Sequence, residues 1–467
     1  MKITIPELAL VVLVGPSGCG KSTFGRKYFK PTEVLSSDFC RGLVSDNEND
    51  QAATKDAFEA LHFIARKRLA AGRLTVIDAT NVQPDARKPL IELAREFHVL
   101  PVALVFNFSD RLCQDRNRNR TDRDFGPHVI RNQSQQLRRS LRGLEREGFR
   151  HLHIFNTPEE IEGLEIERQQ LWNNLKHEHG PFDLIGDVHG CFEELVRLLS
   201  ELGYAVEQNN GHLSVTPPPG RKAVFVGDLV DRGPGITNVL RLVMSMVEAG
   251  MALCVPGNHD VKLLRKLRGK DVKISHGLAD SLAQLDLETP EFRKQVSDFI
   301  DELVSHYVLD DGKLVVAHAG MKESMQGRGS GAVRSFALFG ETTGETDEYG
   351  LPVRYDWAAE YRGRAMVVYG HTPVAEPEWL NRTINIDTGC VFGGKLTALR
   401  YPEKELVSVP ATREYYAPAK PFLSPVAAPQ ELTHQQQLED LLDIDDVTGK
   451  RIVETRLHGK LTIREEN

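Results

Sequence analysis

Cysteine is scarce in this chain and is scattered along it. The six cysteines of the 467 residues stand at positions 19, 40, 113, 191, 254 and 390, and none of them forms a CxxC pair. A chain of this length buries enough apolar surface to fold without disulfide bonds. The pattern therefore favours a reducing compartment, and we expect a cytoplasmic protein.

Long hydrophobic runs and a positive net charge are also missing. The most apolar early run, LALVVLV from Leu8 to Val14, is far shorter than the roughly 20 residues that cross a bilayer. A glycine-rich loop follows it instead of a small-residue cleavage site, which excludes a secretory signal and indicates a buried strand. We therefore expect no contact with a membrane. The net charge of -8 gives no general attraction to nucleic acid, so such binding requires a local basic patch.

Apolar strands and helical patterns alternate along residues 1–175. This alternation predicts an α/β domain with a mostly parallel sheet and helices on both faces. A new strand at FDLIGD starts a second domain, residues 180–402, in which each apolar run ends in a polar residue or a glycine. Residues 403–467 begin with the Pro- and Ala-rich segment ATREYYAPAKPFLSPVAAPQ, which we interpret as a linker to the start of a truncated further domain.

The segment GPSGCGKS, Gly15 to Ser22, fits the GxxxxGK(S/T) pattern and lies between an apolar strand and a helix. Glycines there allow backbone N–H groups to point at phosphates, and the helix N-terminus adds partial positive charge. Lys21 is expected to reach the β- and γ-phosphates of ATP or another NTP, and Ser22 to ligate Mg²⁺. The predicted nucleotide-binding residues are Gly15, Ser17, Gly18, Gly20, Lys21, Ser22 and Thr23.

Candidate groups for the phosphate acceptor follow the second strand, in SSDFCR. Ligands of open α/β sheets bind at the carboxyl ends of the strands, so Asp38 is a candidate to take a proton from an attacking hydroxyl. Arg41, three residues later, is a candidate to hold a phosphate of the acceptor. The alternative is that Asp38 is only a helix N-cap and Arg41 only a surface charge. Asp78, in VIDATN, is a weaker candidate for positioning Mg²⁺.

The segment SDRLCQDRNRNRTDRDFG is dense in arginine. Such a segment is often a solvated helix face, but in a P-loop domain it also fits a lid that closes over the nucleotide. The P-loop, the DxxR pattern of Asp38 and Arg41, and this segment together resemble the 5′-OH polynucleotide kinase family. The resemblance implies that Asp38 is the general base, that Arg41 holds the phosphate on the 3′ side of the acceptor, and that Arg116 and Arg120 contact the donor phosphates.

Five short motifs with metal-binding residue types follow in the second domain: GDVHG, GDLVDRG, GNHD, AHAG and YGHT. Each motif comes at the end of an apolar strand, and several strand ends converge on one rim, so we expect these side chains to meet. Mixed oxygen and nitrogen ligands without thiolate suit two ions such as Mn²⁺ or Ni²⁺. The predicted ligands are Asp187, His189, Asp228, Asn258, His318 and His371, with Asp228 bridging the two ions.

Two ions about 3.5–4 Å apart activate water near neutral pH and clamp phosphate oxygens. Arg232 is expected to hold the phosphate through two parallel hydrogen bonds. His259 is expected to stabilise or protonate the leaving oxygen, with Asp260 fixing its orientation. Asp387, in NIDTGC, is a weaker candidate at the same rim. The order of these motifs resembles the calcineurin-like metallophosphoesterases, which implies a β-sandwich flanked by helices.

A 5′-kinase followed by a binuclear phosphoesterase resembles the bacterial polynucleotide kinase-phosphatase of RNA repair. The resemblance implies NTP-dependent phosphorylation of 5′-OH ends, opening of 2′,3′-cyclic phosphates, and removal of the remaining 2′- or 3′-phosphate. RNA or DNA ends would be the substrates, with an RNA 3′-end methyltransferase and a ligase module as further partners. A ligase-type domain follows in that family, but this chain lacks a KxDG motif, so we expect no sealing activity.

Two other interpretations remain open. The phosphoesterase motifs also fit enzymes that cleave dinucleoside polyphosphates or phosphoproteins, and the P-loop domain would then phosphorylate a small molecule. Alternatively, the arginine-rich segment is an RNA-binding platform and one or both sites are inactive. The presence of Lys21, Asp38 and the whole predicted ligand set argues against inactive sites.

Overall fold

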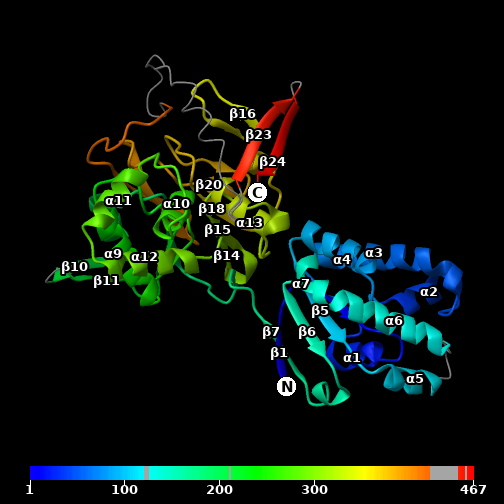
Figure 1. Cartoon of the computed structure of the whole chain (residues 1–467). Coiled ribbons are helices and arrows are strands. Elements are labelled where there is room, and N and C mark those ends of the chain that lie inside the picture. The colour runs from blue at the N-terminus through cyan, green and yellow to red at the C-terminus, as the bar shows by residue number, and fades with distance from the viewer. Residues whose placement is uncertain (120–125, 210–211, 421–450, 458–459, 467) are drawn as a thin grey trace. The chain divides into compact units, whose positions relative to one another are not determined.

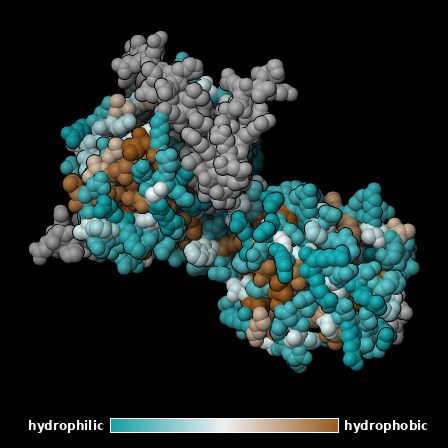
Figure 2. Space-filling model, viewed as in Figure 1, coloured by the Kyte–Doolittle hydropathy of each residue, from teal (hydrophilic) through white to brown (hydrophobic). Residues whose placement is uncertain are grey.

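The computed structural model describes residues 1–119, 126–209, 212–420, 451–457 and 460–466. The chain divides into two compact units, the first comprising Met1–Leu171 with Arg328–Ser330 and the second Trp172–Gly327 with Gly331–Asn467 (Figure 1). The face of each unit seen in Figure 2 is mostly hydrophilic, with limited hydrophobic patches. Across the described residues, every helix is too short or too polar to cross a membrane.

A five-stranded parallel sheet forms the centre of the first unit. Its order is β3 (Val34–Ser36), β4 (Thr75–Asp78), β2 (Ala9–Val14), β5 (Leu100–Phe106) and β6 (His151–Phe155). Alternate residues of β2 enter different hydrophobic clusters, Leu10 and Val12 on one face and Val11 and Leu13 on the other. Both faces of the sheet are therefore covered, as a parallel sheet requires. A separate parallel pair joins β1 (Lys2–Pro6) and β7 (Glu165–Gln169).

Helices cover both faces of this sheet. Leu61 and Leu90, from α3 and α4, pack with the Leu10 face, whereas Phe24 of α1 packs with the Val11 face. The helices are α1 (Lys21–Tyr28), α2 (Ser37–Ser45), α3 (Thr54–Ala70), α4 (Pro84–Glu96), α5 (Asp110–Arg118), α6 (Pro127–Ser140) and α7 (Leu144–Glu147). The prediction of an α/β domain with a mostly parallel sheet is confirmed.

The second unit is a sandwich of two sheets. One has the order β13 (Ala252–Cys254), β12 (Lys222–Phe225), β9 (Phe182–Ile185), β21 (Lys395–Tyr401) and β22 (Glu405–Pro410). The other has the order β19 (Trp379–Leu380), β20 (Thr383–Asn385), β18 (Met366–Tyr369), β15 (Leu314–Ala317), β14 (His306–Leu309) and β8 (Asn174–Leu175). Leu184 and Val224 of the first sheet share one buried cluster with Val316 and Val368 of the second.

Helices flank both outer faces of the sandwich. Leu195, Val239 and Val296 of α8, α9 and α12 pack with Phe225 of the first sheet, and Phe336 of α13 packs with Val367 of the second. The helices are α8 (Phe192–Glu201), α9 (Ile236–Glu248), α10 (Asn258–Leu267), α11 (Leu278–Asp286), α12 (Pro290–Glu302), α13 (Gly331–Phe339) and α14 (Trp357–Glu360). The predicted β-sandwich flanked by helices is confirmed.

The sandwich continues beyond residue 402, where the sequence indicated the start of a linker. β22 pairs with β21 along its whole length, from Lys395 opposite Pro410 to Arg400 opposite Glu405. The sequence did not predict β22, because the proline-rich stretch that follows it is typical of a linker. Near the end of the chain, β23 (Arg451–Leu457) and β24 (Lys460–Glu466) form an antiparallel pair. The start of a further domain in this region, of the ligase (nucleotidyltransferase-like) type that the resemblance implies, stays a prediction.

Candidate active sites

The glycine-rich loop of the first unit connects β2 to α1. Gly18 and Gly20 have φ of +81° and +102°, a region that side chains with a Cβ rarely adopt. A Cβ on Gly18 would also lie 2.3 Å from the carbonyl oxygen of Cys113. The Lys21 ammonium donates to the carbonyl oxygens of Gly15 at 2.8 Å and Pro16 at 2.9 Å. The lysine is thus held inside the turn.

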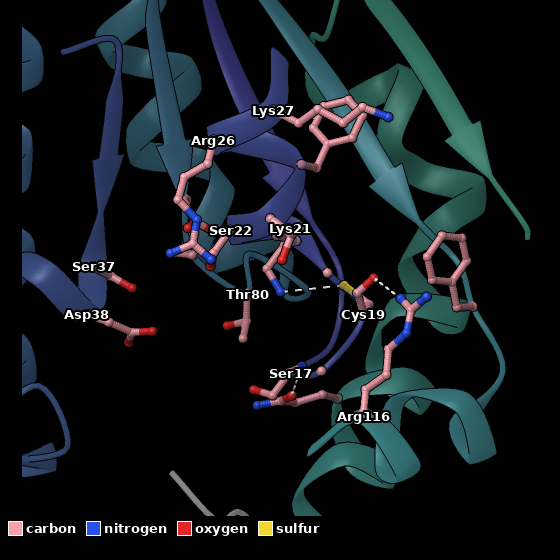
Figure 3. A pocket seen from close by; sticks show the side chains of 18 of the residues that line it. Ser17, Cys19, Lys21, Ser22, Arg26, Lys27, Ser37, Asp38, Thr80 and Arg116 are labelled. Carbon is pink, nitrogen blue, oxygen red and sulfur yellow. Dashed lines mark hydrogen bonds between the residues drawn. The ribbon is translucent and has the colours of Figure 1, made fainter. Parts of the chain in front are cut away.

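A cavity of about 1080 Å³ opens in front of this loop (Figure 3). Ser17, Gly18, Gly20, Lys21, Ser22 and Thr23 line it. Gly15, also predicted to bind the nucleotide, is not among the residues that line the cavity, and its N–H donates to the Thr80 carbonyl oxygen at 2.9 Å. The Gln133 side chain accepts from the Ser17 N–H at 2.8 Å, a contact between loop and α6 that no sequence pattern predicted. The cavity has the size of a nucleotide pocket.

Asp38 and Arg41 lie together on the first turns of α2. Arg41 is 5% exposed, and it donates to Asp38 Oδ1 at 2.9 Å and to the Glu48 carbonyl oxygen at 2.7 Å. Ser36 is the N-cap and accepts from the Phe39 N–H. The alternative of a capping aspartate beside a surface arginine is therefore wrong. Both residues line the cavity, into which Asp38 points (Figure 3).

Asp78, predicted only weakly, lines the same cavity. It is 6% exposed, and β4 places it level with Leu13 of β2. Burial raises its pKa, while the Lys21 charge and a hydrogen bond from Ser22 act in the opposite direction. A hydroxyl and a carboxylate side by side are oxygen ligands of the kind that Mg²⁺ uses beside a nucleotide.

Only one of the two predicted lid arginines lies within the described residues. Arg116, on α5, donates to the Cys19 carbonyl oxygen at 3.2 Å and lines the cavity on its loop side (Figure 3). Arg120 lies outside the described residues, so its assignment stays a prediction.

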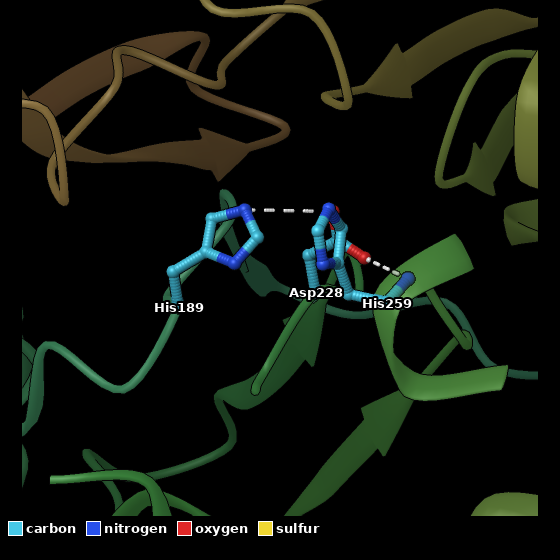
Figure 4. A group of neighbouring side chains, drawn as sticks. All are labelled: His189, Asp228 and His259. Atoms are coloured by element: carbon cyan, nitrogen blue, oxygen red, sulfur yellow. Dashed lines mark hydrogen bonds and ion pairs between the residues drawn. The ribbon is translucent and has the colours of Figure 1, made fainter. Parts of the chain in front are cut away.

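The second unit brings its predicted ligands together at strand ends. Asp187 and His189 follow β9, Asp228 follows β12, Asn258 begins α10 after β13, His318 follows β15, and His371 follows β18. Two groups of possible ligand atoms, each lying within 4.8 Å, share Asp228: one with His189 and His259, the other with His318 and His371. Figure 4 shows the His189 ring facing Asp228, whose Oδ1 accepts from the His259 backbone N–H at 3.0 Å.

The hydrogen bonds of two histidines fix where their lone pairs point. Nδ1 of His189 lies 2.7 Å from the Val230 carbonyl oxygen, and Nδ1 of His318 lies 3.1 Å from that of Val226. Each Nδ1 therefore carries the proton, and each Nε2 is an acceptor. Both Nε2 atoms face Asp228 Oδ2, at 3.5 and 3.4 Å.

Acceptors thus face acceptors around Asp228. His318 Nε2 also lies 3.0 Å from Asn258 Oδ1, and the buried Asp187 Oδ1 has no hydrogen-bond partner within the part of the chain that the structure describes. Lone pairs that converge without a proton between them repel unless a cation separates them. The donor set therefore fits divalent metal ions, which the sequence predicted.

Burial shifts the pKa values of these groups toward their neutral forms. It raises the pKa values of Asp187 and Asp228 well above their ordinary range, and the neighbouring carboxylates of Asp387 and Asp260 act in the same direction. Burial also lowers the pKa of His318 to about 3, so this ring stays neutral. Two metal ions would supply the positive charge that ionised carboxylates need here.

Backbone strain is concentrated at the same place. Among the described residues, thirteen non-glycine residues have φ between +43° and +74°, and five of them lie at this site: His189, Asp228, Asp231, Arg232 and His371. Conformations of this kind cost free energy and persist where the surroundings enforce them, often at functional sites. Glycines permit the close approach of chains: a Cβ on Gly370 would lie 2.0 Å from Asp187 Oδ1, and one on Gly257 2.0 Å from Asp228 Oδ1.

Arg232 and His259 lie beside the predicted ligands in a continuous network. Arg232 donates to His189 Nε2 at 2.9 Å and to His259 Nε2 at 3.1 Å. Nδ1 of His259 lies 2.6 Å from Asp231 Oδ2. The expectation that Asp260 orients His259 is therefore wrong: Asp260 accepts from the N–H groups of Gly257 and Leu229 instead. Asp260 directly follows His259 in the sequence, but its carboxylate accepts from the backbone N–H of Gly257 at the start of α10.

Other residues at this site had weak or no sequence signals. Asp387 is 4% exposed and accepts from the Gly389 N–H at 3.0 Å, and burial raises its pKa to about 6. The Phe392 and Tyr416 rings lie 5.0 and 5.7 Å from the Arg232 guanidinium. The second aspartate of GDLVDRG was a readable signal for Asp231, whereas no spacing connects Tyr416 to Arg232.

Comparison with known proteins agrees with this geometry. Residues 10–144 match the model of an AAA domain, and residues 180–375 match the model of the calcineurin-like phosphoesterases. The asymmetrical bis(5'-nucleosyl)-tetraphosphatase PrpE of Anoxybacillus flavithermus is 50% identical over 240 residues, 50% of this chain and 96% of that protein. Its Bacillus subtilis counterpart is 47% identical over 238 residues, 50% of this chain and 96% of that protein.

These matches extend over nearly the whole length of the relatives, and the matched phosphoesterase segment contains all six predicted metal ligands, from Asp187 to His371. The remaining half of this chain contains the P-loop and its cavity. The chain therefore belongs to the calcineurin-like phosphoesterase family, and it joins a phosphoesterase domain of this family to an N-terminal P-loop domain of the kinase type.

Proposed function

We propose that this chain heals broken RNA ends. The first unit would transfer a phosphate from ATP or another NTP to a 5′-OH end. The second unit would open a 2′,3′-cyclic phosphate and remove the 2′- or 3′-phosphate that remains. The two activities act on opposite ends of one break, so the phosphate added by one is not the phosphate removed by the other.

The observation that carries the kinase proposal is the pair of Asp38 and Arg41 in the P-loop cavity. Asp38 would accept the proton of the attacking 5′-hydroxyl. Arg41, whose guanidinium holds Asp38 in position, would meet the phosphate that a polynucleotide carries next to its 5′ sugar. Lys21 would leave its carbonyl partners and bind the β- and γ-phosphates. A small-molecule acceptor that carries no phosphate of its own would leave Arg41 without a phosphate to bind.

The phosphoesterase proposal starts from the ligand set around Asp228. Asp187, His189, Asn258, His318 and His371 would complete the sites of two divalent ions, Mn²⁺ or Ni²⁺, with Asp228 between them. Such ions, when bound, activate water and neutralise phosphate charge.

The other groups of the site act on the phosphate and the leaving oxygen. Arg232 would donate two hydrogen bonds to the phosphate, replacing its present contacts with His189 and His259. His259 would give a proton to the leaving oxygen, and Asp231 would hold the opposite ring nitrogen. His259 and Asp231 are buried, which limits the access of bulk water to the leaving oxygen.

Hydrolysis of dinucleoside polyphosphates is the second candidate function. It is supported by PrpE relatives, which are named as tetraphosphatases and are 50% and 47% identical over half of this chain. The P-loop unit, whose cavity holds an acceptor-side arginine, has no evident role in that reaction. A scaffold with inactive sites is the least supported reading, since every predicted ligand within the described residues lies at the site. RNA or DNA ends, a ligase module and an RNA 3′-end methyltransferase are the proposed partners.

A single oligonucleotide tests both halves of the proposal. An RNA with a 5′-OH and a 2′,3′-cyclic phosphate, incubated with ATP, Mg²⁺ and Mn²⁺, should gain a 5′-phosphate and end in a 3′-OH. A parallel reaction with diadenosine tetraphosphate measures the second candidate. An enzyme that cleaves the tetraphosphate but leaves both RNA ends unchanged would exclude end healing.

A further inference from the structure

The segment after β22 folds back onto the phosphoesterase site. Phe392 and Glu414 form an antiparallel bridge, and the N–H groups of Tyr415 and Tyr416 both lie 3.0 Å from the Val391 carbonyl oxygen. The buried Glu194 carboxylate accepts from the Thr412 N–H at 2.8 Å and from the Tyr415 hydroxyl at 2.9 Å. Residues 411–416 are therefore fixed against the unit by main-chain and side-chain hydrogen bonds.

This segment reaches the phosphate-binding arginine. The Tyr416 ring lies 5.7 Å from the Arg232 guanidinium and the Phe392 ring lies 5.0 Å from it. The same guanidinium donates to His189 and His259. Arg232 thus connects the predicted metal centre with two aromatic side chains outside it.

A second cavity begins at Arg232 and is about 520 Å³ in volume. Arg413 and Tyr415 form part of its wall, with the Arg413 guanidinium 5.1 Å from the Tyr415 ring. Asp280, Gln284 and Glu414 also line it. The cavity therefore joins two guanidinium groups, an aromatic ring and acceptor oxygens, and it is within the size range of small-ligand pockets.

We infer that this cavity is a nucleoside subsite, which holds the sugar and base attached to the phosphate bound by Arg232. The inference deepens the proposed phosphoesterase function and rests on it. Any of the nucleic-acid bases can stack on a guanidinium group or an aromatic ring, because each base has a flat π-face. The Asp280 and Glu414 carboxylates would accept from ribose hydroxyls or base N–H groups. Arg413 is then the specificity-determining residue, and Tyr416 positions Arg232.

The test compares a nucleotide with a substrate that has no nucleoside. For the whole chain with Mn²⁺, kcat/KM is measured on adenosine 2′,3′-cyclic phosphate, on diadenosine tetraphosphate and on p-nitrophenyl phosphate. Arg413→Ala should lower kcat/KM on a nucleotide substrate at least about tenfold more than on p-nitrophenyl phosphate, the size of one stacked base. The control is Arg268→Ala, which removes an exposed arginine of the same unit that pairs with Asp301.

The outcomes separate the subsite from the proposed function. If Arg413→Ala lowers the nucleotide and p-nitrophenyl phosphate rates by the same factor, or lowers neither, the subsite is overturned. If the unaltered chain hydrolyses p-nitrophenyl phosphate but neither nucleotide, the proposed function fails as well. The two nucleotide substrates show which of them the subsite accepts.

Tyr416 gives an independent test. Tyr416→Ala removes the ring beside Arg232 and should raise KM for every phosphomonoester. Tyr416→Phe keeps the ring and should restore most of the lost affinity. Equal losses in both variants would mean that the hydroxyl matters and that ring stacking on Arg232 does not.

Discussion

For individual side chains, the sequence predicts which residues form the candidate sites but not which residues they contact. The identities of the metal-binding candidates follow from short motifs, because a polar residue at the end of a buried strand has few structural roles. Their partners do not follow. Asp231, not Asp260, contacts His259, and Arg41 is buried against Asp38 rather than exposed. Such pairings depend on which chain segments become neighbours in space, which spacing alone does not encode.

His306 leads to a prediction about pH and stability. It is fully buried on β14, accepts from the Gly327 N–H at 2.9 Å, and lies with Nδ1 3.0 Å from Ser305 Oγ. Burial lowers its pKa to about 3, against about 6.5 in an unfolded chain. The folded state therefore stays unprotonated at pH values where the unfolded state takes up a proton. This contribution to stability is present above about pH 6.5 and is lost as pH falls toward about 3.

Urea unfolding at several pH values measures this effect. Between pH 7 and 5 the free energy of unfolding of the unaltered chain should fall about 2 kcal/mol more than that of His306→Gln. His177→Gln, at an exposed histidine of the same unit, should show the pH dependence of the unaltered chain. Parallel curves for the unaltered chain and His306→Gln would contradict the prediction.

Helices and strands were predictable where their hydrophobic patterns were long. The parallel sheet of the first unit follows from runs such as LALVVLV, whose alternate residues pack on opposite faces. β22 was missed because a proline-rich segment follows it and because an edge strand has little apolar pattern: its residues are largely exposed. The contact of residues 411–416 with the site was equally unreadable, since it depends on the buried Glu194 of α8.

The contact between α4 and α7 depends on one buried ion pair. Arg87 is fully buried and donates to both Glu147 carboxylate oxygens, at 2.7 and 2.6 Å, and to the Asn81 carbonyl oxygen at 2.7 Å. Arg87→Met would leave Glu147 without its counter-charge, so the free energy of unfolding should drop by about 3–5 kcal/mol. Arg66→Met, which removes a half-exposed pair with Glu96, should cost under about 1 kcal/mol. Equal losses in urea unfolding would contradict this.

At the scale of the whole molecule, two units contain two separate candidate sites for phosphate chemistry. Each unit has its own hydrophobic clusters, and no predicted residue of one site is needed to build the other. The combination was readable from the sequence because both sites rest on short, ordered motifs. The choice between RNA ends and dinucleoside polyphosphates was not, because phosphate-binding groups are common to both substrates.

Separable activities are the expected consequence. Asp38→Ala should lower 5′ phosphorylation of an oligonucleotide by about 10²–10⁴-fold and leave phosphate release from its 3′ end unchanged. Asp187→Ala should do the opposite, because it removes a ligand of the metal centre. Both activities are measured on the same labelled RNA. Loss of both activities in either variant would show that the sites depend on each other.

The fold-back of residues 411–416 has a practical consequence for dissecting the enzyme. A phosphoesterase fragment that stops at Pro402 would lose an edge strand and the two tyrosines that follow it. It would keep every predicted metal ligand, yet Glu194 would lose the hydrogen-bond donors Thr412 and Tyr415, and Arg232 would lose one aromatic neighbour. Low activity of such a fragment would result from the missing residues and not from a weak active site. A fragment made to measure the phosphoesterase alone should therefore extend at least to Tyr416.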